Sequence, residues 1–386
     1  MSLRDPIRVG VLFSRTGDIC TIETSQLLGT LFAIEEINEA GGIDGREIEV
    51  VYYDPGSSPD LYRMRAEQLV LRDKISVIFG CYLSSTRKAV LPVIEKWNRL
   101  LFYPTLYEGF ECSGNVIYTG AAPNQNSVQL AEYMSSTYGA RVYMVGSDYI
   151  YPYESNRIMM ELLQQHPHGE KVGERYVPLD AGQPDFTSII EDIKKKQPDF
   201  VFSTVVGNST QYFYQAYADA GLDPRNMPIA SLTTLETEVA QMGKDVAAGH
   251  ISSAPYFQSI ASPLNRGCLE RFAARFGSQT TPNAGWEAAY FQVHLFAKAM
   301  ALSGSDSIDA LMPYLLGMEF DAPQGRVSID PANNHACLHP RIGVVNGDDG
   351  QFTIVRQAKR AVHPDPYLVT HSLGDWTLRL GSTVES

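Results

Sequence analysis

Short apolar runs alternate along the chain with longer segments whose apolar residues recur every three to four positions. The runs are typical of buried strands, and the longer segments of amphipathic helices. In the first third, this pattern predicts strands at 8–14, 47–53, 75–80 and 100–104, alternating with helices at 25–40, 60–74 and 84–98. Such a rhythm is typical of parallel βαβ units with helices on both faces of a sheet. It predicts a doubly wound, Rossmann-like α/β lobe.

The same rhythm starts again near Pro123. It predicts strands at 142–146, 172–177, 200–205 and 228–231, alternating with helices at 125–139, 154–165, 186–195 and 210–220. Helices at 265–276, 286–303 and 308–317 follow, and then short strands at 326–329, 341–345 and 352–355. We expect the late helices to complete the first lobe and the last strands to return to the second. The predicted division is 1–121 and 253–322 for lobe 1, and 122–252 and 323–386 for lobe 2.

Composition narrows the class of function. Among 386 residues, 31 Lys and Arg oppose 44 Asp and Glu, so the net charge is −13. Phosphate backbones and anionic lipids repel an acidic chain electrostatically, so we expect no direct binding of nucleic acid or membrane. The sequence contains no run of about eighteen apolar residues, so it predicts no membrane span. The five cysteines are scattered, without metal-ligand spacing, which favours a reducing compartment.

Motifs of common enzyme classes are missing. The sequence has no GxxxxGK[ST] phosphate loop, no GxGxxG after the first strand, no HExxH and no GxSxG. We therefore expect no catalytic residue, no cofactor and no metal. The missing motifs do not exclude an enzyme, because a catalytic triad assembles in space rather than along the sequence, but they make an enzyme the least favoured class of function.

Hydroxyl and tyrosine side chains gather where predicted strands end, at residues 81–86, 103–109, 147–152, 203–208 and 231–234. One such cluster is usually a turn. Five of them, drawn from both lobes at the carboxyl edge of parallel sheets, indicate a shared ligand cleft between the lobes. Ser84 or Ser85 is expected to cap the helix that follows it. No Arg or Lys recurs at these ends, which favours a small, neutral, polar ligand.

Several longer segments of the sequence resemble those of a known protein family. They are Gly80-Cys81-Tyr82 with Thr86–Val90, Tyr103-Pro104-Thr105 with Tyr107-Glu108-Gly109, Ala122–Asn126, Gly146–Pro152, Ser231–Thr234, Ala322–Gly325, and Pro364–Tyr367 with Asp375-Trp376. Over nearly the whole chain the sequence resembles the type I periplasmic-binding-protein superfamily, and within it the short-chain amide and urea binders. It is most similar to the amide-sensing negative regulators of amidase operons. The resemblance implies two α/β lobes joined by three crossovers, with the ligand in the cleft.

The resemblance also implies a set of ligand-binding residues. These are Tyr82, Ser84, Tyr103 and Thr105 in lobe 1, and Tyr149 or Tyr151 together with Thr233 in lobe 2. Ser85, Leu106, Val205 and Gly207, at the same strand ends, are further candidate ligand-binding residues. Leu106 departs from the pattern, because the amide sensors have a proline there. The exact ligand, among short amides and urea, therefore stays open.

Two functions remain as the main alternatives. The first is a cytoplasmic amide sensor that holds an RNA-binding antitermination regulator inactive until amide binds. The second is a periplasmic solute-binding protein of an ABC transporter for urea or short amides, in which case a signal sequence precedes this chain in the gene. Whether the chain forms a homodimer stays open.

Overall fold

The computed structural model describes residues 5–277 and 281–369, and the chain divides into two compact units. Unit 1 comprises residues 1–107, 111–121 and 266–337, and unit 2 comprises 108–110, 122–265 and 338–386. Apart from the short excursion at 108–110, the chain passes between the units three times. The Asp375-Trp376 phrase lies outside the described residues. None of the described helices is long and apolar enough to cross a membrane.

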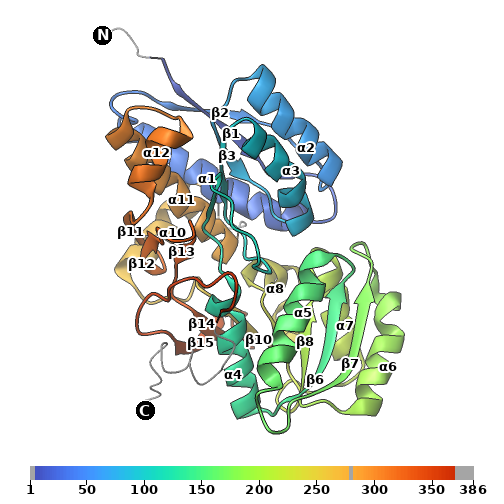
Figure 1. Cartoon of the computed structure of the whole chain (residues 1–386). Coiled ribbons are helices and arrows are strands. Elements are labelled where there is room, and N and C mark those ends of the chain that lie inside the picture. Colours follow the sequence, from blue (N-terminus) through green and yellow to red (C-terminus); the bar gives the residue numbers. More distant parts are fainter. Residues whose placement is uncertain (1–4, 278–280, 370–386) are drawn as a thin grey trace. The chain divides into compact units, whose positions relative to one another are not determined.

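Unit 1 is built on a five-stranded parallel sheet in the order β2-β1-β3-β4-β5. The strands are β1 Ile7–Leu12, β2 Ile48–Tyr52, β3 Val77–Gly80, β4 Leu100–Tyr103 and β5 Val116–Tyr118. The helices are α1 Cys20–Glu39, α2 Pro59–Glu67, α3 Ser84–Lys96, α10 Pro263–Phe276, α11 Ala284–Ser303 and α12 Ile308–Leu315. Helices α2 and α3 cover one face of the sheet, whereas α1 and α11 lie on the other (Figure 1). A π-helical turn, Gln68–Arg72, follows α2, so the single helix predicted at 60–74 is two elements.

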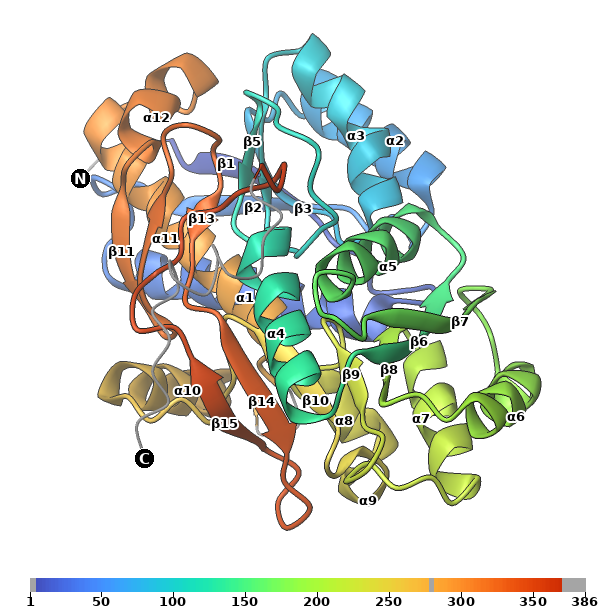
Figure 2. The same ribbon diagram turned by 60° about the horizontal axis from the view of Figure 1, so that its bottom comes forward.

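Unit 2 is built on a seven-stranded mixed sheet in the order β15-β14-β10-β9-β8-β6-β7. The strands are β6 Arg141–Ser147, β7 Glu170–Val177, β8 Phe200–Thr204, β9 Ile229–Ser231, β10 Ile251–Ala254, β14 Arg341–Val345 and β15 Phe352–Gln357. The helices are α4 Ser127–Thr137, α5 Ile150–Leu163, α6 Thr187–Lys196, α7 Ser209–Asp219, α8 Glu236–Met242 and α9 Lys244–Ala247, with 3₁₀ turns at Pro123–Gln125 and Gln183–Phe186. Helices α4 and α5 lie on one face, and α6 and α7 on the other (Figure 2).

The second and third passages between the units come later in the chain than predicted. Residues 253–265 belong to unit 2 because β10, which the apolar pattern did not predict, pairs with β9 and β14. Residues 323–337 belong to unit 1 because β12 Gly325–Ile329 pairs with β11 Glu319–Ala322 and β13 Ala336–Cys337. The strand predicted at 326–329 therefore does not return to the second lobe. The predicted fold class, two doubly wound α/β lobes, is confirmed.

Candidate functional site

The carboxyl ends of β3 and β4 meet in unit 1. The Tyr103 hydroxyl donates to the backbone oxygen of Tyr82 over 2.7 Å, and Thr105 Oγ1 donates to the backbone oxygen of Cys81 over 3.3 Å. All four residues are buried. Of the other predicted residues here, Ser84 is buried, whereas Ser85 and Leu106 are partly exposed. The structure thus brings the lobe 1 residues of the predicted site to one sheet edge.

Close backbone packing holds these ends in place. Cys81 has φ +72°, in the left-handed region that non-glycine residues seldom adopt. A Cβ atom on Gly120 would lie 2.0 Å from the backbone carbonyl carbon of Thr105. Thr105 can take its position only because residue 120 has no side chain.

Ser84 does not cap helix α3, contrary to the sequence prediction. The cap position is Leu83, with φ −65° and ψ 144°, and its side chain forms no capping hydrogen bond. Ser84 is the first helical residue, and its hydroxyl accepts from Arg87 Nη1 over 3.3 Å. Ser85, one position further on, does not cap the helix either. The reason is the backbone: the chain enters the helix one residue before the serines.

Arg87 is a buried cation that the sequence prediction left out of the site. Its guanidinium binds both carboxylate oxygens of Glu111, at 2.8 and 3.4 Å. It also lies 4.7 Å from the ring centre of Tyr103 and 4.6 Å from that of Tyr107. Burial alone would raise the pKa of Glu111, but the opposing charge of Arg87 holds that pKa below its usual value. The positive charge at this edge is therefore engaged by a carboxylate of the same unit.

Two residues of α1 also reach this edge, and no motif in the sequence marks them. Gln26 Nε2 donates to Thr105 Oγ1 over 2.8 Å, and Glu23 accepts from the backbone N–H of Ser14 and from the Tyr62 hydroxyl. Both side chains have no exposed surface. The signal that could have found them is their position, since a helix that follows the first strand of a parallel sheet starts at the carboxyl edge of that sheet.

The ends of β6, β8 and β9 meet in unit 2. Ser147 Oγ accepts from the backbone N–H of Val206 over 3.2 Å, which joins β6 to β8. Thr233 Oγ1 donates to the backbone oxygen of Val205 over 3.3 Å, which joins β9 to β8. Ser231 Oγ accepts from the backbone N–H of Thr233 over 3.1 Å and orders the turn. The predicted residues Val205 and Thr233 are thus direct neighbours.

The other predicted residues of unit 2 flank these turns. Gly207 has φ +69°, a conformation that suits glycine in the turn before α7. Tyr149 directly precedes α5 and is half-buried, while Tyr151 in its first turn is buried. Their ring centres lie 6.2 Å apart. The structure therefore places all five lobe 2 residues at strand ends or in the segments that follow them.

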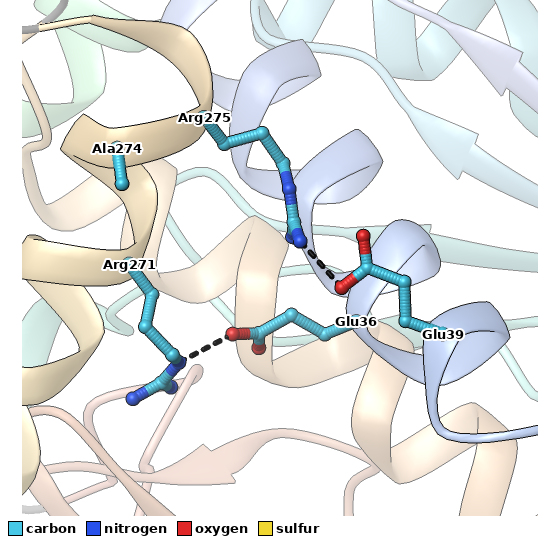
Figure 3. A pocket seen from close by; sticks show the side chains of 5 residues that line it. All are labelled: Glu36, Glu39, Arg271, Ala274 and Arg275. Carbon is cyan, nitrogen blue, oxygen red and sulfur yellow. Dashed lines mark hydrogen bonds and ion pairs between the residues drawn. The ribbon is translucent and has the colours of Figure 1, made fainter.

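A separate surface pocket of about 450 Å³ lies between α1 and α10 of unit 1 (Figure 3). Arg271 pairs with Glu36 at 2.7 Å, and Arg275 with Glu39 at 2.5 Å. No residue of the predicted site lines it. Its charged side chains are paired with one another, so this pocket adds nothing to the ligand site.

Known proteins resemble the chain over most of its length. It is 25% identical over 356 residues to "Leu/Ile/Val-binding protein homolog 6" of Brucella abortus, covering 90% of each chain. It is 24% identical over 330 residues to the "Leucine-, isoleucine-, valine-, threonine-, and alanine-binding protein" of Pseudomonas aeruginosa, covering 84% of this chain and 86% of the relative.

Solved structures share the fold. A solute binding protein of an ABC transporter from Rhodopseudomonas palustris HaA2, in complex with p-hydroxybenzoic acid, superposes with a TM-score of 0.85 at 23% identity, covering 95% of this chain and 99% of that one. A branched-chain amino acid transporter substrate binding protein from Streptococcus pneumoniae, in complex with isoleucine, gives 0.78 at 21% identity, covering 93% and 100%. The family described as periplasmic binding protein domain matches residues 7–373. The superfamily predicted from the strand-end phrases is thereby confirmed, and the chain belongs to the periplasmic binding protein family.

Proposed function

We propose that this protein is a solute-binding protein that takes up a small, neutral, polar molecule and delivers it to an ABC transporter outside the cytoplasm. The family supports the binding role, and the names of its relatives and structural neighbours support the transporter role. The cytoplasmic location expected for a sensor has no such support. Short amides and urea are the ligand class that the residues favour.

The ion pair between Arg87 and Glu111 is the observation that bears on the charge of the ligand. Isoleucine and p-hydroxybenzoic acid, the ligands of two structural neighbours, each carry a carboxyl group. Among the buried residues that the structure describes, Arg87 and Arg341 are the only arginine or lysine side chains. Arg87 holds Glu111, and Arg341 donates to the backbone oxygens of Pro255 and His339. The charge of Arg87 is balanced within unit 1 by Glu111, which favours an uncharged ligand.

The hydroxyl groups at the strand ends supply the matching hydrogen bonds. We propose that Ser84, Thr105 and Tyr82 in unit 1 and Thr233 and Tyr151 in unit 2 contact the ligand, with the remaining predicted residues shaping the wall. An amide or urea offers both a carbonyl acceptor and N–H donors. In a buried site each of these groups needs a partner, because an unpaired polar group costs about 1–3 kcal/mol.

A binding panel tests the proposal. Isothermal titration calorimetry with acetamide, butyramide, urea, leucine and p-hydroxybenzoate, each up to millimolar concentration, should show binding of at least one neutral compound and weaker binding of the acids. Tight binding of leucine or p-hydroxybenzoate alone would contradict the neutral ligand.

Thr233→Ala has a matched control in Thr210→Ala. Both hydroxyls donate to the backbone oxygen of Val205, at 3.3 and 3.1 Å, and both side chains are buried. Loss of the Thr233 hydroxyl should weaken binding by ~1–3 kcal/mol, and Ser84→Ala by a similar amount. Thr210→Ala should lower the stability of the protein but leave its affinity for the ligand unchanged. Equal affinities of all three variants and the wild type would refute the assignment of these contacts.

The amide-sensing role is a second candidate, because the strand-end phrases resemble that branch and a neutral ligand suits it. In that role the partner would be an RNA-binding antitermination regulator. The net charge of −13 suits a basic partner electrostatically. Co-purification with such a regulator, reversed by acetamide, would favour the sensor. Export of the protein in its host would favour the transporter.

A further inference from the structure

The first turns of α1 carry two buried side-chain oxygens that have no hydrogen-bond partner among the described residues. They are Glu23 Oε1 and Gln26 Oε1, three positions apart on one helix. Residues with this spacing share one helix face. Unpaired buried polar atoms are rare in native proteins, and each one needs an explanation.

Neighbouring hydrogen bonds determine the orientation of the Gln26 amide. The single hydroxyl hydrogen of Thr105 is directed to the backbone oxygen of Cys81, at 3.3 Å. Thr105 Oγ1 can therefore only accept from Gln26, and Nε2 is the donor, at 2.8 Å. The amide oxygen is left as a free acceptor beside a residue of the proposed ligand site.

The second oxygen belongs to the Glu23 carboxyl group, in which only the other oxygen, Oε2, accepts hydrogen bonds. Glu23 Oε2 accepts from the Ser14 backbone N–H and from the Tyr62 hydroxyl, which in turn accepts from Ser14 Oγ at 3.2 Å. Burial raises the pKa of Glu23 to about 7, and the Cys81 thiol and Asp54 are its electrostatic neighbours. The Glu23 carboxyl group is thus within electrostatic range of Cys81, the residue after β3.

We propose that Gln26 is a specificity-determining residue whose side-chain oxygen accepts an N–H of the ligand, with Glu23 Oε1 as a second polar contact from the same helix. This inference rests on the proposed function and narrows the ligand to a compound with an unsubstituted amide or urea nitrogen. A site built to bind an N–H group rejects a similar molecule without it, because its own buried acceptor is then left unpaired.

Acetone tests the inference on the wild-type protein. It has the shape of acetamide with a methyl group in place of NH₂. Calorimetry at matched concentrations should show at least tenfold weaker binding of acetone than of acetamide. Equal affinity would overturn the role of an N–H acceptor while leaving the proposed binding function intact. Binding of neither acetamide nor urea would instead count against the proposed function.

Gln26→Met then identifies the acceptor, with Gln292→Met as its matched control. Gln292 is also a fully buried glutamine of unit 1, and it accepts from Thr119 Oγ1 over 2.9 Å. Gln26→Met should weaken acetamide binding at least tenfold and reduce the preference for acetamide over acetone, and Gln292→Met should change neither.

An unchanged preference in Gln26→Met would show that the Gln26 oxygen does not accept from the ligand, and would overturn the proposal. If Gln26→Met fails to fold, Gln26→Glu keeps the length and an oxygen acceptor but removes the Nε2 donor. It should retain the preference for acetamide over acetone, and loss of that preference would contradict the role of the oxygen.

Discussion

Replacing Arg87 by methionine should destabilise unit 1 strongly. The guanidinium is fully buried, binds both oxygens of Glu111 and lies over two tyrosine rings. Its loss leaves the Glu111 carboxylate, whose side chain is 11% exposed, without its main counter-charge. Breaking a buried ion pair by removing one partner costs about 3–5 kcal/mol.

Lys88→Met is the matched control. Lys88 Nζ binds the same carboxylate at 3.2 Å, but its side chain is 46% exposed. Exposed ion pairs contribute only ~0–1 kcal/mol, because water already solvates the charge. The contrast between neighbouring cations on one carboxylate isolates the effect of burial.

Thermal unfolding followed by tryptophan fluorescence measures both variants, since Trp97 and Trp286 lie in unit 1. The free energy of unfolding should fall by several kcal/mol in Arg87→Met and by less than about 1 kcal/mol in Lys88→Met. The double variant Arg87→Met, Glu111→Met should recover part of the loss, because no unpaired charge remains.

The loss should also depend on pH. The Glu111 pKa is lowered in the folded state, so its stabilisation is present above the unfolded pKa and is lost as the pH falls through the folded one. The gap between wild type and Arg87→Met should narrow accordingly below about pH 4.5. A gap of less than 1 kcal/mol at pH 7 would refute the role given to the buried pair.

Three further predictions concern other positions. Gly120→Ala should destabilise the protein by about 1–3 kcal/mol or more, whereas Gly114→Ala, which has open space around it, should change stability by less than ~0.5 kcal/mol. Equal midpoints of thermal unfolding would contradict the packing at Thr105. Glu23 stays protonated in the folded protein up to about pH 7, because burial raises its pKa. The free energy of unfolding should therefore fall as the pH rises towards that value. Relative to Glu23→Gln, the wild type should lose about 3 kcal/mol of stability as the pH rises from 4.5 to 8, and parallel pH profiles would disprove this. Burial lowers the pKa of His250 to about 3, so stability should rise with pH between about 3 and 6.5; His250→Asn should reduce that slope, measured by thermal unfolding across this range, and an unchanged slope would count against a buried neutral imidazole.

Only those parts of the candidate site that follow from the local pattern of apolar residues could be predicted from the sequence. The strand ends carrying Tyr82, Tyr103 and Thr233 follow from short apolar runs, because side-chain burial in a parallel sheet imposes such runs on the sequence. Strand β10, with the sequence Ile-Ser-Ser-Ala, was not predicted because its two buried serines break the apolar run. Their hydroxyls donate to the backbone oxygens of Thr234, in the segment after β9, and of Asn126, at the start of α4. That missing strand in turn displaced the predicted boundary between the units.

Local sequence pattern is therefore enough to predict the class of fold, two doubly wound α/β units, and the set of polar strand ends at their carboxyl edges. These properties depend on the spacing of apolar residues within a few turns or a single strand. The three-dimensional arrangement is needed to see that Arg87 pairs with Glu111, 24 residues away, and that Gln26 donates to Thr105, 79 residues away. Such pairs depend on where separate segments meet in three dimensions, which no local periodicity encodes. They decide the charge and the hydrogen-bonding capacity of the site, and hence the ligand proposed for it.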